Sequence, residues 1–204
     1  MKHENSRTLH RYWNRLRGHR RAPMRLEIDP GAIAAILGNA FVLERLDPVA
    51  YRYRLAGTRV CSYLGKELRG TSFPAQWADD ERDTVENLLY TITEDAAGAL
   101  IGLTAHGGTG RTAPLELMLL PLARDNGALD RIIGTVSTLR PSDWVGALPV
   151  TRLEIKSIRL LWPDGKPLVG RSGGTGVGIA NPPINTDLPP ARTPLRVIEG
   201  GLQS

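Results

Sequence analysis

The order of strand and helix signals along residues 40–139 constrains this chain more than any single motif. Two strand signals come first, and a stretch broken by glycine and proline follows them. One long amphipathic helix and three further strand signals complete the region. Strands joined by short turns pair as antiparallel hairpins. The order therefore predicts an α+β domain in which a five-stranded antiparallel sheet carries helices on one face.

The strand predictions rest on alternation and on turn residues. In the segment 51–55, Tyr-Arg-Tyr-Arg-Leu, aromatic or apolar side chains alternate with arginine, which is the pattern of a half-buried strand. Asp47-Pro48 supplies a turn to the preceding strand, so the two form a hairpin. We predict strands at 40–46, 51–55, 99–105, 113–123 and 131–139, and either a strand or a short helix at 152–161.

Three helical regions are predicted around these strands. Asp29 is a natural N-cap and Pro30 fits the first helical position, so a helix is expected to begin there and to end at Gly38. Residues 57–78 are too irregular for strands and fit short helical turns. A longer helix begins at Asp79 or Asp80, where its acidic first turn suits the helix dipole. Its buried stripe is Val85, Leu88, Leu89 and Ile92.

The positive charge of the chain is concentrated at its N-terminal end. Residues 1–25 hold eight Lys and Arg residues against one Glu, a net charge of +7. The whole chain has 26 basic and 21 acidic residues, so residues 26–204 hold 18 and 20, a net charge of −2. The excess therefore belongs to an N-terminal arm, and such asymmetry is found in proteins that bind nucleic acid or membrane surfaces.

The arm has the pattern of an amphipathic helix. Arg7, Arg11 and Arg15 run beside an apolar stripe, and Gly18 is a plausible end of the helix. The stripe consists of Leu9, Tyr12, Trp13 and Leu16. Three interpretations stay open: the stripe packs on the body or on a second subunit, the arginines bind RNA or DNA, or the helix lies on a membrane surface.

Composition changes again after residue 162. Residues 163–204 include eight glycines and seven prolines, and such a segment buries too little surface to offset its ordering entropy. We expect a flexible tail there. The predicted organisation is a basic helical arm at 1–25, a folded domain at 26–140, a C-terminal extension at 141–162 and a disordered tail at 163–204.

Several classes of protein are not expected. No apolar run approaches the 18 or so residues that span a bilayer, and the basic N-terminus lacks the apolar stretch of a secretory signal. The chain has one cysteine, Cys61, so it has no disulfide framework, which fits a reducing cytoplasm. We therefore expect a soluble cytoplasmic protein without membrane insertion.

The sequence contains no convincing catalytic or metal-binding pattern. The glycine run at 173–178 leads into Asn-Pro-Pro and not into a helix, so it offers no helix N-terminus to a dinucleotide pyrophosphate. Three of the four histidines lie in the arm, and one thiol cannot complete a zinc tetrahedron. We predict no catalytic residue, no metal and no enzymatic activity.

Particular residues carry a resemblance to a known family. The block Tyr-Arg-Tyr-Arg-Leu-Ala-Gly-Thr at 51–58, followed by the spacing Gly65-x-x-Leu68-x-Gly70, resembles the second strand and first helices of a PAS domain. The lead-in around Trp13 and Asp29-Pro30 and the Phe73-x-x-x-Trp77 pair are similar to those of small single-domain PAS proteins from alphaproteobacteria. The resemblance covers about residues 10–140 and implies the PAS fold and a role in signalling.

The resemblance raises the question of whether the chain has the residues that bind a flavin or a haem. A flavin photoreceptor of the light-oxygen-voltage kind needs a cysteine in an Asn-Cys-Arg-type motif, whereas Cys61 lies earlier, in Arg-Val-Cys-Ser. A haem sensor needs an axial ligand, and the long helix has no histidine. His106, at the end of a strand, is expected to be solvated. We therefore predict no cofactor, and either a small apolar ligand or a fully packed core.

A pocket, if present, would lie between the sheet and the helices. Apolar residues at strand spacing form the core in the first place, and Trp77 is the most informative candidate because a buried indole N–H needs a hydrogen-bond partner. The candidate pocket residues are Tyr53, Leu55, Trp77, Leu88, Leu103, Leu117 and Leu119.

The resulting hypothesis is a stand-alone PAS sensory module that acts through protein–protein contacts in bacterial signal transduction. Partners implied by the resemblance are signalling proteins such as histidine kinases or their regulators. A homodimer is expected to form through Leu9, Trp13 and Leu16. The alternative is a nucleic-acid-binding protein that uses its arginine-rich arm, which the resemblance makes less favoured.

Overall fold

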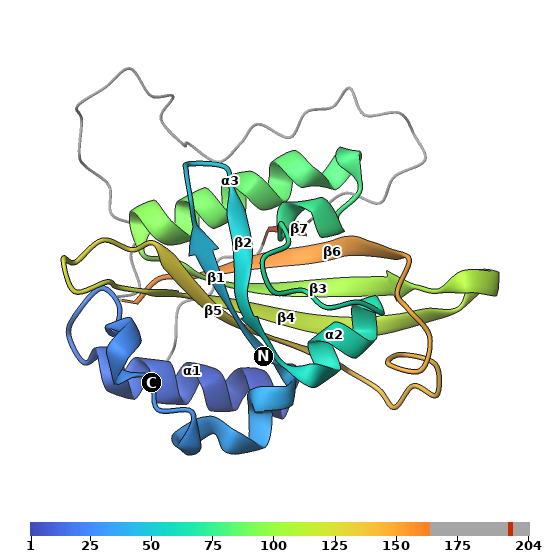
Figure 1. Ribbon diagram of the computed structural model, residues 1–204, viewed down its shortest axis with the longest axis horizontal. Helices are drawn as coiled ribbons and strands as arrows, with labels where there is room; N and C mark the ends of the chain where they lie inside the picture. The colour runs from blue at the N-terminus through green and yellow to red at the C-terminus, as the bar shows by residue number, and fades with distance from the viewer. Residues whose placement is uncertain (164–195, 198–204) are drawn as a thin grey trace.

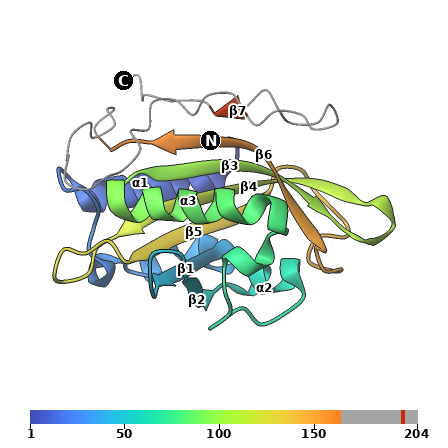
Figure 2. The same ribbon diagram turned by 90° about the horizontal axis from the view of Figure 1, so that it is seen from above.

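The computed structural model describes residues 1–163 and 196–197. Its sheet has the strand order β2-β1-β5-β4-β3-β6-β7, and every neighbouring pair is antiparallel except the two-residue parallel pairing of β6 with β7. Figure 2 shows β1 and β2 at one end of this sheet and β6 and β7 at the other. The strands are β1 (Ala40–Arg45), β2 (Tyr51–Ala56), β3 (Gly98–His106), β4 (Thr112–Leu122), β5 (Arg131–Thr138), β6 (Arg152–Leu161) and β7 (Arg196–Val197).

The helices divide between the two faces of the sheet, as Figure 1 shows for α1 and α3. Their bounds are α1 (Glu4–Arg17), α2 (Thr58–Leu64) and α3 (Asp79–Asp95), with short 3-10 turns η1 (Arg25–Glu27), η2 (Gly31–Asn39), η3 (Pro74–Gln76) and η4 (Gly108–Gly110).

Strand β4 separates two hydrophobic cores. Leu117 and Leu119 point into an inner core, which α2, α3 and the Phe73–Trp77 segment cover. Met118 and Leu120 point to the opposite side, into an outer core that α1 and η2 cover. Because successive side chains of a strand alternate between faces, one apolar strand serves both layers.

The predicted α+β fold with an antiparallel sheet is confirmed. The region left open at 152–161 is a strand, β6, which pairs along β3 and makes a sixth antiparallel strand. At the other edge, the backbone of residues 70–73 covers β2, since the Gly70 amide donates to the Tyr53 carbonyl at 2.7 Å and Phe73 donates to Tyr51 at 2.8 Å. The β2 edge is thereby protected from pairing with other strands.

One local expectation needs correction. The helix expected at residues 29–38 is the 3-10 helix η2, which begins one residue later than predicted, at Gly31. The Asp29 side chain still accepts a hydrogen bond of 2.9 Å from the Gly31 amide. The predicted tail at 163–204 lies outside the described residues apart from Pro163 and β7.

The docking of α1 corrects the expected homodimer interface. Leu9 and Trp13 are 0% and 2% exposed within this single chain, and Leu16 is partly buried beside them. The indole Nε1 of Trp13 donates a hydrogen bond of 2.7 Å to the Pro121 carbonyl on β4. The stripe therefore packs on the body, because the outer face of the chain's own sheet offers it a complementary apolar surface.

No helix among the described residues is both long enough and apolar enough to cross a membrane.

Candidate ligand pocket in the inner core

A small apolar cavity lies in the inner core between β1, β4 and the helical segments above them. About 30 Å³ of it is open to the centre of a water-sized molecule. A single water needs roughly 10–15 Å³ on this measure, so the cavity admits a molecule of only a few heavy atoms. Its lining consists of Phe41, Tyr53, Val60, Tyr63, Leu64, Phe73, Gln76, Trp77, Leu103, Leu115, Leu117, Val136, Val150 and Leu153.

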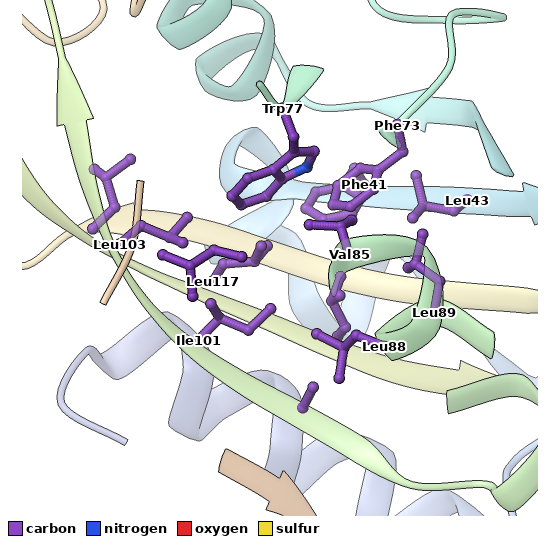
Figure 3. Close-up of a cluster of buried hydrophobic side chains, with 14 of the residues drawn as sticks. Phe41, Leu43, Phe73, Trp77, Val85, Leu88, Leu89, Ile101, Leu103 and Leu117 are labelled. Atoms are coloured by element: carbon purple, nitrogen blue, oxygen red, sulfur yellow. The ribbon is translucent and has the colours of Figure 1, made fainter. Parts of the chain in front are cut away.

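Aromatic side chains form one wall of this cavity. Phe41 from β1 and Tyr53 from β2 meet edge-on with ring centroids 5.6 Å apart, and Phe73 stacks on Phe41 at 5.8 Å. The ring of Trp77 follows, 6.2 Å from that of Phe73. Figure 3 shows the rings of Phe41, Phe73 and Trp77 above Ile101 on β3 and Leu117 on β4. Such ring pairs add specific geometry to the burial of apolar area.

Trp77 has an unsatisfied polar atom in these surroundings. The residue is 3% exposed, and its indole Nε1 has no hydrogen-bond partner among the residues that the structure describes. In Figure 3 the nitrogen lies on the edge of the indole that faces Phe41 and Phe73. A buried donor without an acceptor costs about 1–3 kcal/mol. This N–H is therefore a place where a bound molecule with an acceptor would gain a hydrogen bond.

The hydroxyl groups of the lining differ in their surroundings. Burial raises the pKa of the Tyr53 phenol far above its ordinary range, so this group stays protonated. The Tyr63 hydroxyl accepts a hydrogen bond of 3.3 Å from the amide of Asn39. Asn39 is itself held by its second bond, of 2.9 Å, to the Val136 carbonyl. Tyr63 on α2 is thus tied to the start of β1 and to β5.

Four of the seven predicted pocket residues line the cavity: Tyr53, Trp77, Leu103 and Leu117. Leu88 and Leu119 are buried in the inner core but do not line the cavity.

Leu55 does not point into the pocket, which corrects its prediction. Val42 pairs with Leu55, whereas the next residue, Leu43, pairs with Tyr53. Arg54 is therefore an additional residue in β2, and this bulge breaks the strict alternation. Leu55 shares the side of Val42, which packs on the outer core, and its side chain is 52% exposed.

The other ten lining residues are not among the predicted ones. Phe41 and Leu115 lie in predicted strands, and Phe73 belongs to the pair quoted with Trp77, so alternation and that pair were usable signals. Val150 and Leu153 come from the extension after residue 140. Their place in the pocket follows from the pairing of β6 with β3, which no local pattern indicates.

Cys61 and His106, the two residues weighed as cofactor ligands, do not line the cavity. Cys61 is partly buried against the inner core. His106 is not simply solvated, since its Nε2 lies 2.9 Å from a carboxylate oxygen of Glu154 on β6. Among residues 1–163 and 196–197, no group of three or more His, Cys, Asp or Glu side chains could hold a metal ion.

Comparisons with solved structures find several similar domains. A light-oxygen-voltage domain studied with a flavin analogue has 16% identity and a TM-score of 0.43, covering 57% of this chain and 87% of that one. The light-oxygen-voltage protein of Rhodobacter sphaeroides has 14% identity and a TM-score of 0.42, covering 57% and 71%. The PAS domain of Bordetella pertussis BvgS has 18% identity and a TM-score of 0.40, covering 53% and 83%.

No curated protein matches the chain. The family match is more extensive, because the PAS domain family matches residues 1–137 of the 204, from α1 to one residue before the end of β5. The strand order, the helical cover of the inner face and this match agree, and the chain belongs to the PAS domain family.

Proposed function

We propose that this protein is a non-enzymatic PAS sensory module that detects a small, mainly apolar molecule in its inner core and signals by contact with another protein. A PAS domain is a signal-sensing module, and the family match covers the whole region around the cavity except β6 and the loop before it. The observation that carries the proposal is the unsatisfied indole N–H of Trp77 in an apolar cavity. A ligand with one hydrogen-bond acceptor fits that donor.

The composition of the lining supports a binding role. Its polar members are the side chains of Tyr53, Tyr63, Gln76 and Trp77. Among the residues that the structure describes, the lining contains no carboxylate, imidazole, amine or thiol. A binding pocket needs only a few polar groups to orient a ligand, whereas acid–base or nucleophilic catalysis needs a group that titrates or attacks.

Output through protein contact is the second part of the proposal. PAS domains commonly mediate contacts with other proteins. The partners we propose are signalling proteins such as histidine kinases or their regulators, together with a second copy of the chain. A homodimer would use surfaces other than Leu9 and Trp13, because these side chains are buried within the chain.

The ligand is tested on the purified full chain by native mass spectrometry, an absorption spectrum and thermal unfolding. We expect either a retained non-peptide mass or a melting temperature that cyclopentanone raises more than cyclopentane does. The two probes differ in the carbonyl that can accept from Trp77. The substitution Trp77→Phe removes the donor and is expected to remove the difference between the probes.

Two variants of matched size locate the binding. Leu103→Phe fills the cavity and is expected to abolish binding, whereas Leu55→Phe places the same ring on a half-exposed side chain and is expected to leave binding unchanged. The proposal is wrong if no mass is retained and neither probe changes the melting temperature. Binding that survives in Leu103→Phe would also contradict it.

A further inference from the structure

The docking of α1 on the sheet buries its apolar stripe and leaves polar side chains exposed. Its apolar stripe is buried against the outer core, so the opposite side of the helix faces solvent. Every exposed residue of α1 is polar, and three of the five are arginines. We call Arg7, Arg11 and Arg15 the arginine face; the other exposed residues of α1 are Glu4 and Asn14.

The N-terminal segment that carries the arginine face has a strongly one-sided charge. Residues 1–25 carry a net charge of +7, while residues 26–204 carry −2. Glu4 lies 2.7 Å from the Arg7 guanidinium and 2.9 Å from that of Arg11, so a single carboxylate is shared by two cations. The Arg11 side chain remains 72% exposed. An exposed pair of this kind contributes little stability and opens readily to another anion.

Within the arginine face, Arg15 lies over the ring of Tyr12, with its guanidinium carbon 5.7 Å from the ring centroid. Two further arginines extend this surface beyond the helix. Arg20 and Arg21 are exposed in the turn after Gly18. Arg20 pairs with Glu27 at 3.0 Å, and Arg21 donates to the Glu94 carbonyl. The positive surface therefore continues from α1 toward η1.

We propose that the arginine face binds the phosphate backbone of a nucleic acid. Successive arginines four residues apart rise about 6 Å along the helix axis, close to the roughly 6.8 Å of duplex axis that two nucleotides of one strand occupy. Guanidinium groups bind phosphate in a bidentate manner. This function is separate from ligand binding in the inner core, which lies on the other side of the sheet.

The same face fits other anionic partners less well. A stable protein interface depends on a few buried aromatic or apolar anchors, and the exposed residues of α1 include none. A helix that inserts into a membrane surface also needs an exposed apolar side, whereas that of α1 is buried. Tyr12 and Trp13 are buried as well, so they cannot stack on bases. The binding we propose is therefore independent of nucleotide sequence.

Fluorescence anisotropy of the full chain tests this with a labelled DNA duplex and an RNA strand, each of about 24 nucleotides per strand, between about 50 and 200 mM salt. Affinity is expected to fall steeply as salt rises, because counterions are released on binding. In Arg11→Gln/Arg15→Gln, the slope of log affinity against log salt for the duplex is expected to be smaller by about 2.

The matched control is Arg54→Gln/Arg69→Gln, which removes two exposed charges elsewhere and keeps the same net charge as the test variant. It is expected to bind like the unmodified chain, and circular dichroism checks that both variants fold. The proposal is overturned if Arg11→Gln/Arg15→Gln binds with an unchanged slope, or if the control weakens binding equally. It is also overturned if anionic vesicles or polyglutamate bind while neither nucleic acid does.

Discussion

The carboxylate of Glu116 accepts a hydrogen bond of 2.9 Å from the backbone amide of His3, 113 residues earlier in the chain. Its other oxygen accepts from the Lys2 amide at 2.7 Å. Glu116 lies on β4 and is only 4% exposed. The start of α1, whose free backbone amides form the positive end of the helix dipole, is thus held on the sheet by one buried carboxylate.

Substitution of Glu116 by Gln should weaken this attachment. The amide keeps the size of the side chain but replaces one accepting oxygen by a donor that faces another backbone N–H. We expect Glu116→Gln to lower the free energy of unfolding by about 1–3 kcal/mol, the cost of leaving buried polar groups unpaired. Urea unfolding at neutral pH measures the difference, and an unchanged midpoint would contradict the role of Glu116.

The same carboxylate predicts a pH dependence. Burial by itself raises the pKa of Glu116, but the hydrogen bonds from the Lys2 and His3 amides, together with the positive charge of the N-terminus, outweigh it, so the pKa lies below its ordinary value of 4.5. The stabilisation is therefore fully present above that ordinary value and is lost as the pH falls through the lower folded-state pKa. We expect the stability difference between the unmodified chain and Glu116→Gln to shrink between about pH 5 and pH 3. A difference that is constant with pH would contradict this.

Trp13 provides a test of how α1 is attached. The side chain is 2% exposed and its Nε1 donates to Pro121, so Trp13→Ala removes both packing and a buried hydrogen bond. We expect a loss of about 3–5 kcal/mol in the free energy of unfolding. Because the contact lies within one chain, this loss should not depend on protein concentration. A strong dependence on concentration would instead indicate that Trp13 packs against a second subunit.

Gly134 on β5 is required by close packing. A Cβ at this position would lie 2.4 Å from the Phe41 ring and 2.7 Å from the Met118 carbonyl oxygen. Gly134→Ala is therefore expected to destabilise the chain by about 1–3 kcal/mol, as overpacking does. Gly108→Ala is the matched control, since a Cβ there meets nothing within 4 Å. Equal effects in thermal unfolding would be inconsistent with the contact at Phe41.

The bulge in β2 predicts unequal effects for two leucines. Leu103 is 3% exposed and lines the cavity, so Leu103→Ala is expected to cost about 2–5 kcal/mol. Leu55 is half-exposed, and Leu55→Ala is expected to change the free energy of unfolding by less than about 0.5 kcal/mol. Chemical unfolding of the two variants measures this directly. A large loss in Leu55→Ala would mean that Leu55 points inward.

The elements that could be predicted are those with a local signal. The alternation at residues 51–55 and the periodic stripe of α1 each depend on side chains only a few positions apart in the sequence. Both predicted elements are present. The face of the sheet on which each strand residue lies has a weaker local signal. The run Leu117–Leu120 is continuously apolar because β4 is covered on both sides, so no alternation distinguishes its inner from its outer residues.

The pocket was predictable only in part for a related reason. Tyr53, Trp77, Leu103 and Leu117 follow from element order and from the aromatic pair, and they line the cavity. The position of Leu55 depends on one additional residue in β2, and a bulge of this kind depends on how β1 pairs with it. The bulge reverses the direction of the Leu55 side chain, because a shift of one residue turns a side chain to the other face of the sheet.

The sequence alone determined the kinds and order of most elements between residues 40 and 139, because alternation, helical periodicity and turn residues act over a few neighbouring positions. It also determined that positive charge gathers in the first 25 residues. Only the tertiary structure decided that the stripe of α1 is covered by its own sheet, leaving the arginines outside. It also decided that Trp77 is buried beside a cavity, with no acceptor for its N–H in the described part of the chain. Both depend on contacts between residues far apart in the chain, where packing of individual side chains and not local propensity sets the outcome.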